Sequence, residues 1–71
     1  MKLSEITRLQ TYLQEKFEND AIRLMQRPNA TDSVEMMIAD EFIGVAYRDE
    51  EEGEVSFSLS ICVLAEDLPE G

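Results

Sequence analysis

The stretch that decides the fold is Phe42–Leu64, FIGVAYRDEEEGEVSFSLSICVL. Two runs of alternating apolar residues flank Asp49–Glu54, a segment made almost entirely of acids. Alternation with a period of two is typical of a strand with one buried face, and two such runs around a polar turn predict a β-hairpin. We expect the rest of the chain to complete the sheet that this hairpin begins and to cover it.

The first residues of the chain predict an amphipathic helix over residues 4–18. Apolar side chains recur there every three or four residues, at Ile6, Leu9, Leu13 and Phe17. This spacing places them on one face of an α-helix. Ser4 is a candidate N-cap, and the pair Asn19-Asp20 favours a turn after the helix.

The segments between this helix and the hairpin alternate in the same way and predict two more strands. The expected strands span residues 21–27, 33–39, 42–48 and 55–64, with a tail at 65–71. Short connections between consecutive strands favour an antiparallel meander. The sequence therefore predicts an α+β fold in a single domain, residues 1–71. One N-terminal helix packs on a four-stranded antiparallel sheet, in the order α-β-β-β-β and in two layers.

One helix leaves one face of such a sheet uncovered. With a turn at Asp40-Glu41, Ile38 faces Ile43, and we expect Val45 to face Phe57 in the next strand. This register keeps the large apolar residues under the helix, and the opposite face then carries small and apolar side chains. Uncovered apolar faces usually mark interfaces. We expect the interaction face to consist of Met25, Met37, Ala39, Phe42, Gly44, Ala46 and Ser58.

The charge of the chain is strongly asymmetric. The formal net charge is −10, with residues 1–27 at +1 and residues 28–71 at −11. Binding to nucleic acid or to an anionic membrane requires clustered cations, so neither is an expected partner. The chain offers no apolar run of the roughly 20 residues that a membrane span needs and has no signal-peptide pattern. We expect a soluble, cytoplasmic protein.

The residue types that carry most catalytic chemistry are sparse. The sequence contains no histidine, which removes the commonest general base and metal ligand. The single cysteine, Cys62, has no cation near it in sequence to stabilise a thiolate. The acids of Asp49–Glu54 lack the ligand spacing of a calcium-binding loop, and we interpret them as a solvated turn. The expectation is a protein that is not an enzyme and that has no cofactor and no metal site.

Several stretches resemble a family of short uncharacterised proteins from alphaproteobacteria. The resemblance rests on AIRLMQRP (Ala21–Pro28), EFIGV (Glu41–Val45), DEEEGEVSF (Asp49–Phe57) and the closing ICVLAEDL (Ile61–Leu68). It covers nearly the whole chain and implies a bacterial, cytoplasmic domain of unknown function. The resemblance brings no catalytic or binding residues with it.

We therefore expect a small non-enzymatic interaction module. It would bind a protein partner, or a second copy of itself in a homodimer, through the uncovered sheet face. The alternative is an acidic regulator or decoy whose residues 28–71 bind a basic protein. A third interpretation is a small-molecule site between helix and sheet, although the small predicted core leaves it little room.

Overall fold

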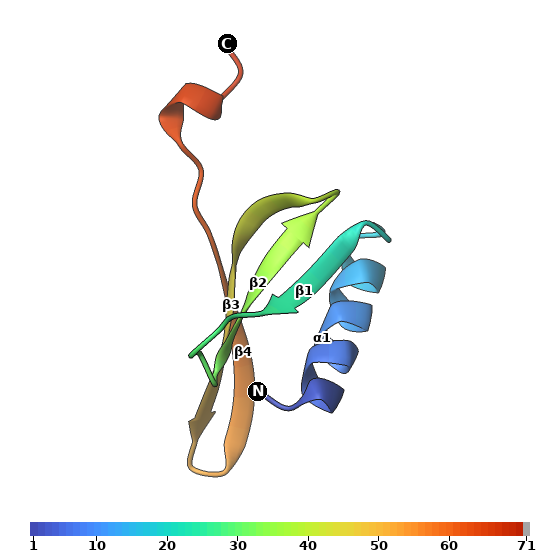
Figure 1. Ribbon diagram of the computed structural model, residues 1–71, viewed down its shortest axis with the longest axis vertical. Helices are drawn as coiled ribbons and strands as arrows, with labels where there is room; N and C mark the ends of the chain where they lie inside the picture. Colours follow the sequence, from blue (N-terminus) through green and yellow to red (C-terminus); the bar gives the residue numbers. More distant parts are fainter. Residues whose placement is uncertain (71) are drawn as a thin grey trace.

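The computed structural model describes residues 1–70 and folds them into one helix, a four-stranded sheet and a short 3-10 helix (Figure 1). The elements are α1 (Leu3–Lys16), β1 (Ile22–Gln26), β2 (Ser33–Ile38), β3 (Glu41–Glu51), β4 (Glu54–Ile61) and η1 (Ala65–Asp67). The strands lie in the order β1-β2-β3-β4, and every neighbouring pair is antiparallel. The predicted α+β fold, with one helix on a four-stranded antiparallel meander, is confirmed. Among residues 1–70, no helix is both long and apolar enough to cross a membrane.

The helix α1 begins and ends differently from the prediction. Its N-cap is Lys2 and not Ser4, and the Lys2 backbone N–H donates to the Glu5 carboxylate at 3.1 Å. At the other end, Glu18 adopts a positive φ of 50°, and the N–H of Asn19 donates to the carbonyl of Gln14. This is the Schellman pattern, with glutamate in the position that glycine usually takes.

Two glutamines join α1 to the outer edge of β1. Gln10 Oε1 accepts a hydrogen bond from the backbone N–H of Leu24 at 2.8 Å. Gln14 Nε2 donates to the backbone carbonyl of Ile22 at 2.9 Å. Both backbone groups point away from β2 and would otherwise need water or another strand. The helix therefore packs chiefly on β1, beside which it lies in Figure 1.

The core is small and lies under the helix. Its buried apolar residues are Ile6, Leu13, Ile22, Leu24, Val34, Met36 and Ala46, with Met1, Leu9, Ile38 and Leu59 packed at its margin. The predicted pairing of β1 with β2 is confirmed, because Ile22 lies opposite Ile38 and Leu24 lies opposite Met36. Four residues that the apolar patterns predict in the core are exposed: Phe17, Tyr47, Phe57 and Ile61.

The predicted pairing of β2 with β3 is wrong. The turn is Ala39-Asp40, one residue earlier than expected, and a bulge near Met36 and Met37 leaves Ile43 as an extra residue in β3. Beyond the bulge, Val34 pairs with Ala46. A slip of one residue exchanges the two faces of a strand.

Because of this slip, four residues of β3 face the side of the sheet opposite to the expected one. Gly44 and Ala46 are buried under the helix side of the sheet, whereas Val45 and Tyr47 lie on the open face. Small residues fit this central position because they lie between large neighbours: Met36 of β2 and Ile61 of β4 flank Gly44.

The hairpin of β3 and β4 is longer than predicted. The acids Asp49, Glu50 and Glu51 belong to β3, and the turn itself consists of Glu52 and Gly53. Pairing is also offset from the prediction, because Phe57 lies opposite Arg48 and not Val45. This hairpin extends away from α1 (Figure 1).

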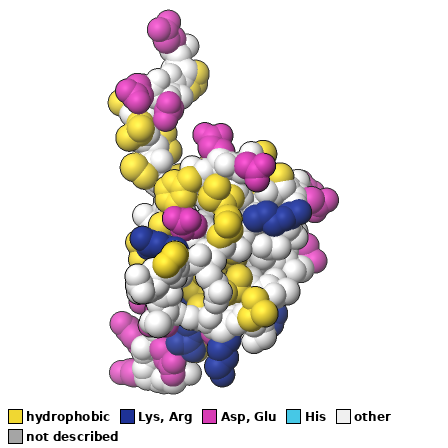
Figure 2. All heavy atoms as spheres, viewed as in Figure 1, with side chains coloured by type: hydrophobic (Ala, Val, Ile, Leu, Met, Phe, Trp, Pro, Cys, Tyr) yellow, Lys and Arg dark blue, Asp and Glu magenta, His cyan; other side chains and the backbone are white. Residues whose placement is uncertain are grey.

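After Ile61 the chain leaves the sheet as a tail. Its apolar side chains Val63, Leu64 and Leu68 are exposed. Figure 2 shows that this tail projects from the body and carries both hydrophobic and acidic side chains. The fourth strand was expected to continue to residue 64, but the pairing with β3 ends at Gly44 and Ile61.

The Ala39-Asp40 turn generates a stability prediction. Both residues have positive φ, 50° and 68°, as a type I′ turn requires, yet neither is the favoured asparagine or glycine. Replacing Ala39→Asn together with Asp40→Gly should raise the free energy of unfolding by about 1 kcal/mol. The melting temperature should rise by roughly 4–8 °C. Gly53→Ala is a control with the opposite expected effect. The added Cβ would meet no other atom, but the φ of 83° is unfavourable for alanine, so the free energy of unfolding should fall through backbone strain alone.

Gly44 generates a second prediction. A Cβ at this position would overlap the backbone carbonyl oxygen of Ser60 in the neighbouring strand. Because backbone cannot move aside as a flexible side chain can, Gly44→Ala should lower the free energy of unfolding by about 2–3 kcal/mol. Urea unfolding followed by circular dichroism measures the change. An unaltered midpoint would contradict the β3–β4 register described above.

Candidate functional site

The open face of the sheet carries a cluster of apolar side chains that no element among residues 1–70 covers. This open-face patch consists of Met25, Met37, Phe42, Val45 and Tyr47. Met37 and Phe42 are direct cross-strand neighbours. Exposed fractions of 53% for Met25, 51% for Phe42 and 44% for Tyr47 show that the patch is accessible. Aromatic and methionine side chains of this kind are enriched where proteins bind one another.

A carboxylate lies within the open-face patch. Glu35 pairs with Met25 on one side and with Val45 on the other, and it is half-buried between the two apolar rows. The hydroxyls of Ser58 and Ser60 border the patch on β4, opposite Tyr47 and Val45. The patch therefore combines an apolar surface with a few polar groups that could orient a partner.

The structure brings together some of the predicted interaction residues and separates others. Met25, Met37, Phe42 and Ser58 lie on the open face. Gly44 and Ala46 do not, since both are buried on the helix side, and Ala39 lies in the β2–β3 turn. Sequence reasoning missed Val45 and Tyr47, because the predicted register placed them in the core.

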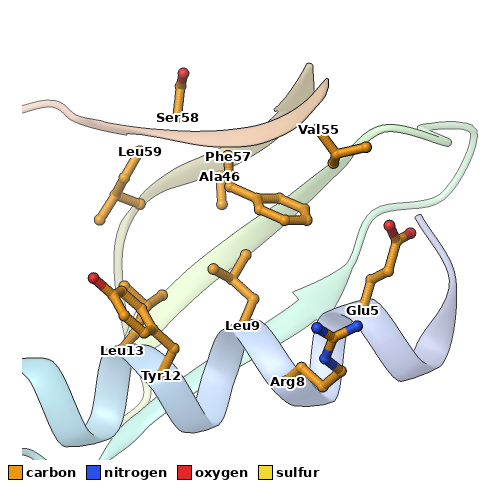
Figure 3. Close-up of a pocket in the computed structure, with 10 residues that line it drawn as sticks. All are labelled: Glu5, Arg8, Leu9, Tyr12, Leu13, Ala46, Val55, Phe57, Ser58 and Leu59. Carbon is orange, nitrogen blue, oxygen red and sulfur yellow. The ribbon is translucent and has the colours of Figure 1, made fainter. Parts of the chain in front are cut away.

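The helix side of the sheet holds a groove of about 640 Å³ between α1 and β4 (Figure 3). Leu9, Tyr12 and Leu13 point from the helix toward the sheet, and Phe57 and Leu59 point from β4 toward the helix. From the sequence we expected little room for a small molecule between helix and sheet, and the space found there is this groove. Tyr12 is 56% exposed, so the groove is open along one side and does not enclose a ligand as small-molecule sites do.

Two ion pairs share Arg48, and one of them includes Glu5, one of the residues that line this groove. The Arg48 Nε donates to Glu5 Oε2 at 3.0 Å, and Arg48 Nη1 donates to Glu50 Oε1 at 3.1 Å. The Glu5 carboxylate thus binds the N-terminus of α1 through Lys2 and the middle of β3 through Arg48. The hydrogen bond from Arg48 and, to a smaller extent, the one from the Lys2 backbone hold the pKa of Glu5 below its ordinary value of 4.5.

Acidic side chains gather at the turn of the β3–β4 hairpin, the lower end of the body in Figures 1 and 2. Asp49, Glu51, Glu52 and Glu54 line a hollow there. Within residues 1–70, no three histidine, cysteine, aspartate or glutamate side chains are arranged to hold a metal ion. Cys62 is a free, exposed thiol at the start of the tail.

A family model described as "Protein of unknown function (DUF3126)" matches residues 5–67. The chain belongs to the DUF3126 family. The match extends from the first turn of α1 to η1, so it includes the open-face patch, the groove and the acidic hairpin of this DUF3126 protein. The resemblance to a family of short uncharacterised proteins is thereby confirmed, and the alphaproteobacterial origin stays a prediction. Neither the curated proteins nor the solved structures gave a match.

The Glu5–Arg48 pair generates a prediction for the pH dependence of stability. Because the folded pKa of Glu5 is depressed, its contribution is present above the unfolded pKa and is lost as the pH falls through the folded pKa. Glu5→Gln should therefore be less stable than wild type at neutral pH, and the difference should shrink below about pH 4.5.

Urea unfolding of both proteins across this pH range measures the effect. Comparing the two cancels the contribution of the other acids, which Glu5→Gln leaves unchanged. Glu15→Gln on the exposed side of α1 is the matched control and should follow wild type. A difference between Glu5→Gln and wild type that persists unchanged into acid would show that the ion pair is not its source.

Proposed function

We propose that this DUF3126 protein is a small non-enzymatic interaction module that binds a partner protein through its open-face patch. The observation that carries the proposal is the exposure of Met25, Phe42 and Tyr47 on a face that no described element covers. Exposed apolar clusters are rare on small soluble proteins that have no partner. Tyrosine, as at Tyr47, is one of the residue types most often found at the energetic centre of interfaces. Phenylalanine, as at Phe42, is enriched in interfaces as a whole.

The proposal places the module in the cytoplasm. Its one thiol, Cys62, is exposed and unpaired, and reducing compartments keep such thiols free.

The acidic hairpin supports a second candidate, a regulator or decoy that binds a basic protein. Four carboxylates line its hollow, and residues 28–71 carry a net charge of −11. Attraction of this kind depends on long-range charge and weakens as salt screens it. Binding through the open-face patch buries apolar surface and is far less sensitive to salt.

Capture of partners by immobilised Phe42→Glu, compared with wild type, tests the proposal. Phe42→Glu places a charge within the patch, beside Met37, without touching the core, so capture should fall at least tenfold. Tyr12→Glu is the matched control, because it also replaces a half-exposed aromatic by glutamate, but in the groove. It should capture like wild type.

The alternative outcomes separate the other surfaces. If Tyr12→Glu loses capture of the partner and Phe42→Glu does not, the partner binds in the groove between α1 and β4. Capture that both variants retain and that disappears at high salt would support the acidic regulator. Either result would overturn the open-face proposal.

A further inference from the structure

The two edge strands of the sheet differ in whether their outward backbone groups have hydrogen-bond partners. On β1, Gln10 and Gln14 of the helix bind the outward backbone groups of Leu24 and Ile22. On β4, within residues 1–70, no hydrogen bond reaches the outer edge of Glu54–Ile61. Unpaired strand edges are templates for another strand, and proteins usually cover or interrupt them. Here one edge is covered and the other, eight residues long, is open.

The turn of the hairpin determines which backbone groups point outward from β4. In a two-residue turn the flanking residues, Glu51 and Glu54, form a hydrogen-bonded pair. Bonding then alternates, so the N–H and C=O groups of the odd-numbered residues of β4 point away from β3. The same alternation sends the N–H of Arg48 toward the first half of the sheet, where it donates to Asp32 at 2.9 Å.

The outward backbone groups belong to residues with apolar, partly exposed side chains. They are Val55, Phe57, Leu59 and Ile61. The strand has no lysine and no proline, and its single charge, Glu54, lies at its beginning. It therefore lacks the features that usually prevent edge-to-edge pairing.

We propose that a second copy of this chain pairs antiparallel with β4 and extends the sheet to eight strands around a two-fold axis. This goes beyond the proposed function, because it uses the sheet edge and not the open-face patch. Full overlap of the outward groups places the axis at Ser58, with Val55 opposite Ile61 of the second copy and Phe57 opposite Leu59 of the second copy. Four such pairs exchange about eight backbone hydrogen bonds, within the range of a typical interface.

The charge distribution is compatible with this arrangement. In the full-overlap register Glu54 lies opposite Cys62 of the second copy, so the two paired β4 strands bring no like charges opposite each other. The two Glu54 residues are then eight residues apart along the strands, about 26 Å. This exceeds the Debye length of about 8 Å at physiological ionic strength, so the two acidic hairpin ends scarcely repel each other. The α1 helices of both copies then lie on the same face of the eight-stranded sheet. The groove between α1 and β4 of one copy adjoins the same groove of the second copy at the two-fold axis.

Cysteine cross-linking at the axis tests the pairing and its register. In a Cys62→Ser background, Ser58→Cys should form a disulfide-linked dimer under mild oxidation, since Cα atoms of a non-hydrogen-bonded pair lie about 4.5 Å apart. Ser56→Cys and Ser60→Cys are matched controls on the same exposed face. In the dimer each of these cysteines would lie four residues, about 13 Å along the strands, from the same cysteine in the second copy. Neither variant should therefore cross-link by itself. A mixture of the two control variants should form the mixed dimer.

A second measurement does not depend on the introduced thiols. Phe57→Pro removes an outward N–H and leaves the β3 ladder intact, as proline in an edge strand does. Sedimentation equilibrium should show wild type as a dimer and Phe57→Pro as a monomer of unchanged circular dichroism. Phe42→Glu should remain a dimer, which separates this inference from the open-face proposal. A monomeric wild type, or equal cross-linking at positions 56, 58 and 60, would overturn the pairing.

Discussion

Two hydrogen bonds, one accepted by Gln10 and one donated by Gln14, join α1 to the backbone of β1 and hold the helix over that edge of the sheet. A four-stranded sheet is about 19 Å wide, whereas a helix with its side chains is about 10 Å across. A helix fixed at one edge therefore cannot reach the other. The narrow core, the groove beside β4 and the half-exposed Phe57 all follow from this placement. The ion pair between Glu5 and Arg48 connects the helix to the part of the sheet beyond β1, because it joins the first turn of α1 to β3.

The sequence was sufficient for the element order and for the first hairpin. The alternation in 21–27 and 33–39 has large apolar residues on one side of each strand, so the register of β1 with β2 had one favourable solution. In FIGVAY (Phe42–Tyr47) both sets of alternating residues are apolar or small, and the pattern cannot choose between its faces. Turn geometry and the bulge at Ile43 made that choice instead. An Ala-Asp pair with two positive φ values is not a turn that residue preferences would suggest.

The candidate site was predictable to the extent that it does not depend on β3. Met25 and Met37 were placed correctly from the first hairpin, and Phe42 because it lies before the bulge. Val45 and Tyr47 replaced Gly44 and Ala46 because one inserted residue exchanged the faces beyond it. The open-face patch is more apolar than expected as a result. The groove follows from the helix being narrower than the sheet and lying over β1, a placement that the apolar pattern does not specify.

The meander topology also has a kinetic consequence. Every strand pairs with its neighbour in sequence, and α1 packs on the strand that follows it, so most of the structure forms by closing short loops. Chains of this kind fold quickly, because little loop entropy is lost before contacts form. The Glu5–Arg48 contact is different, since it joins residues 43 positions apart. We expect each hairpin to assemble early, and the contact between Glu5 and Arg48 to form as the two halves of the chain come together.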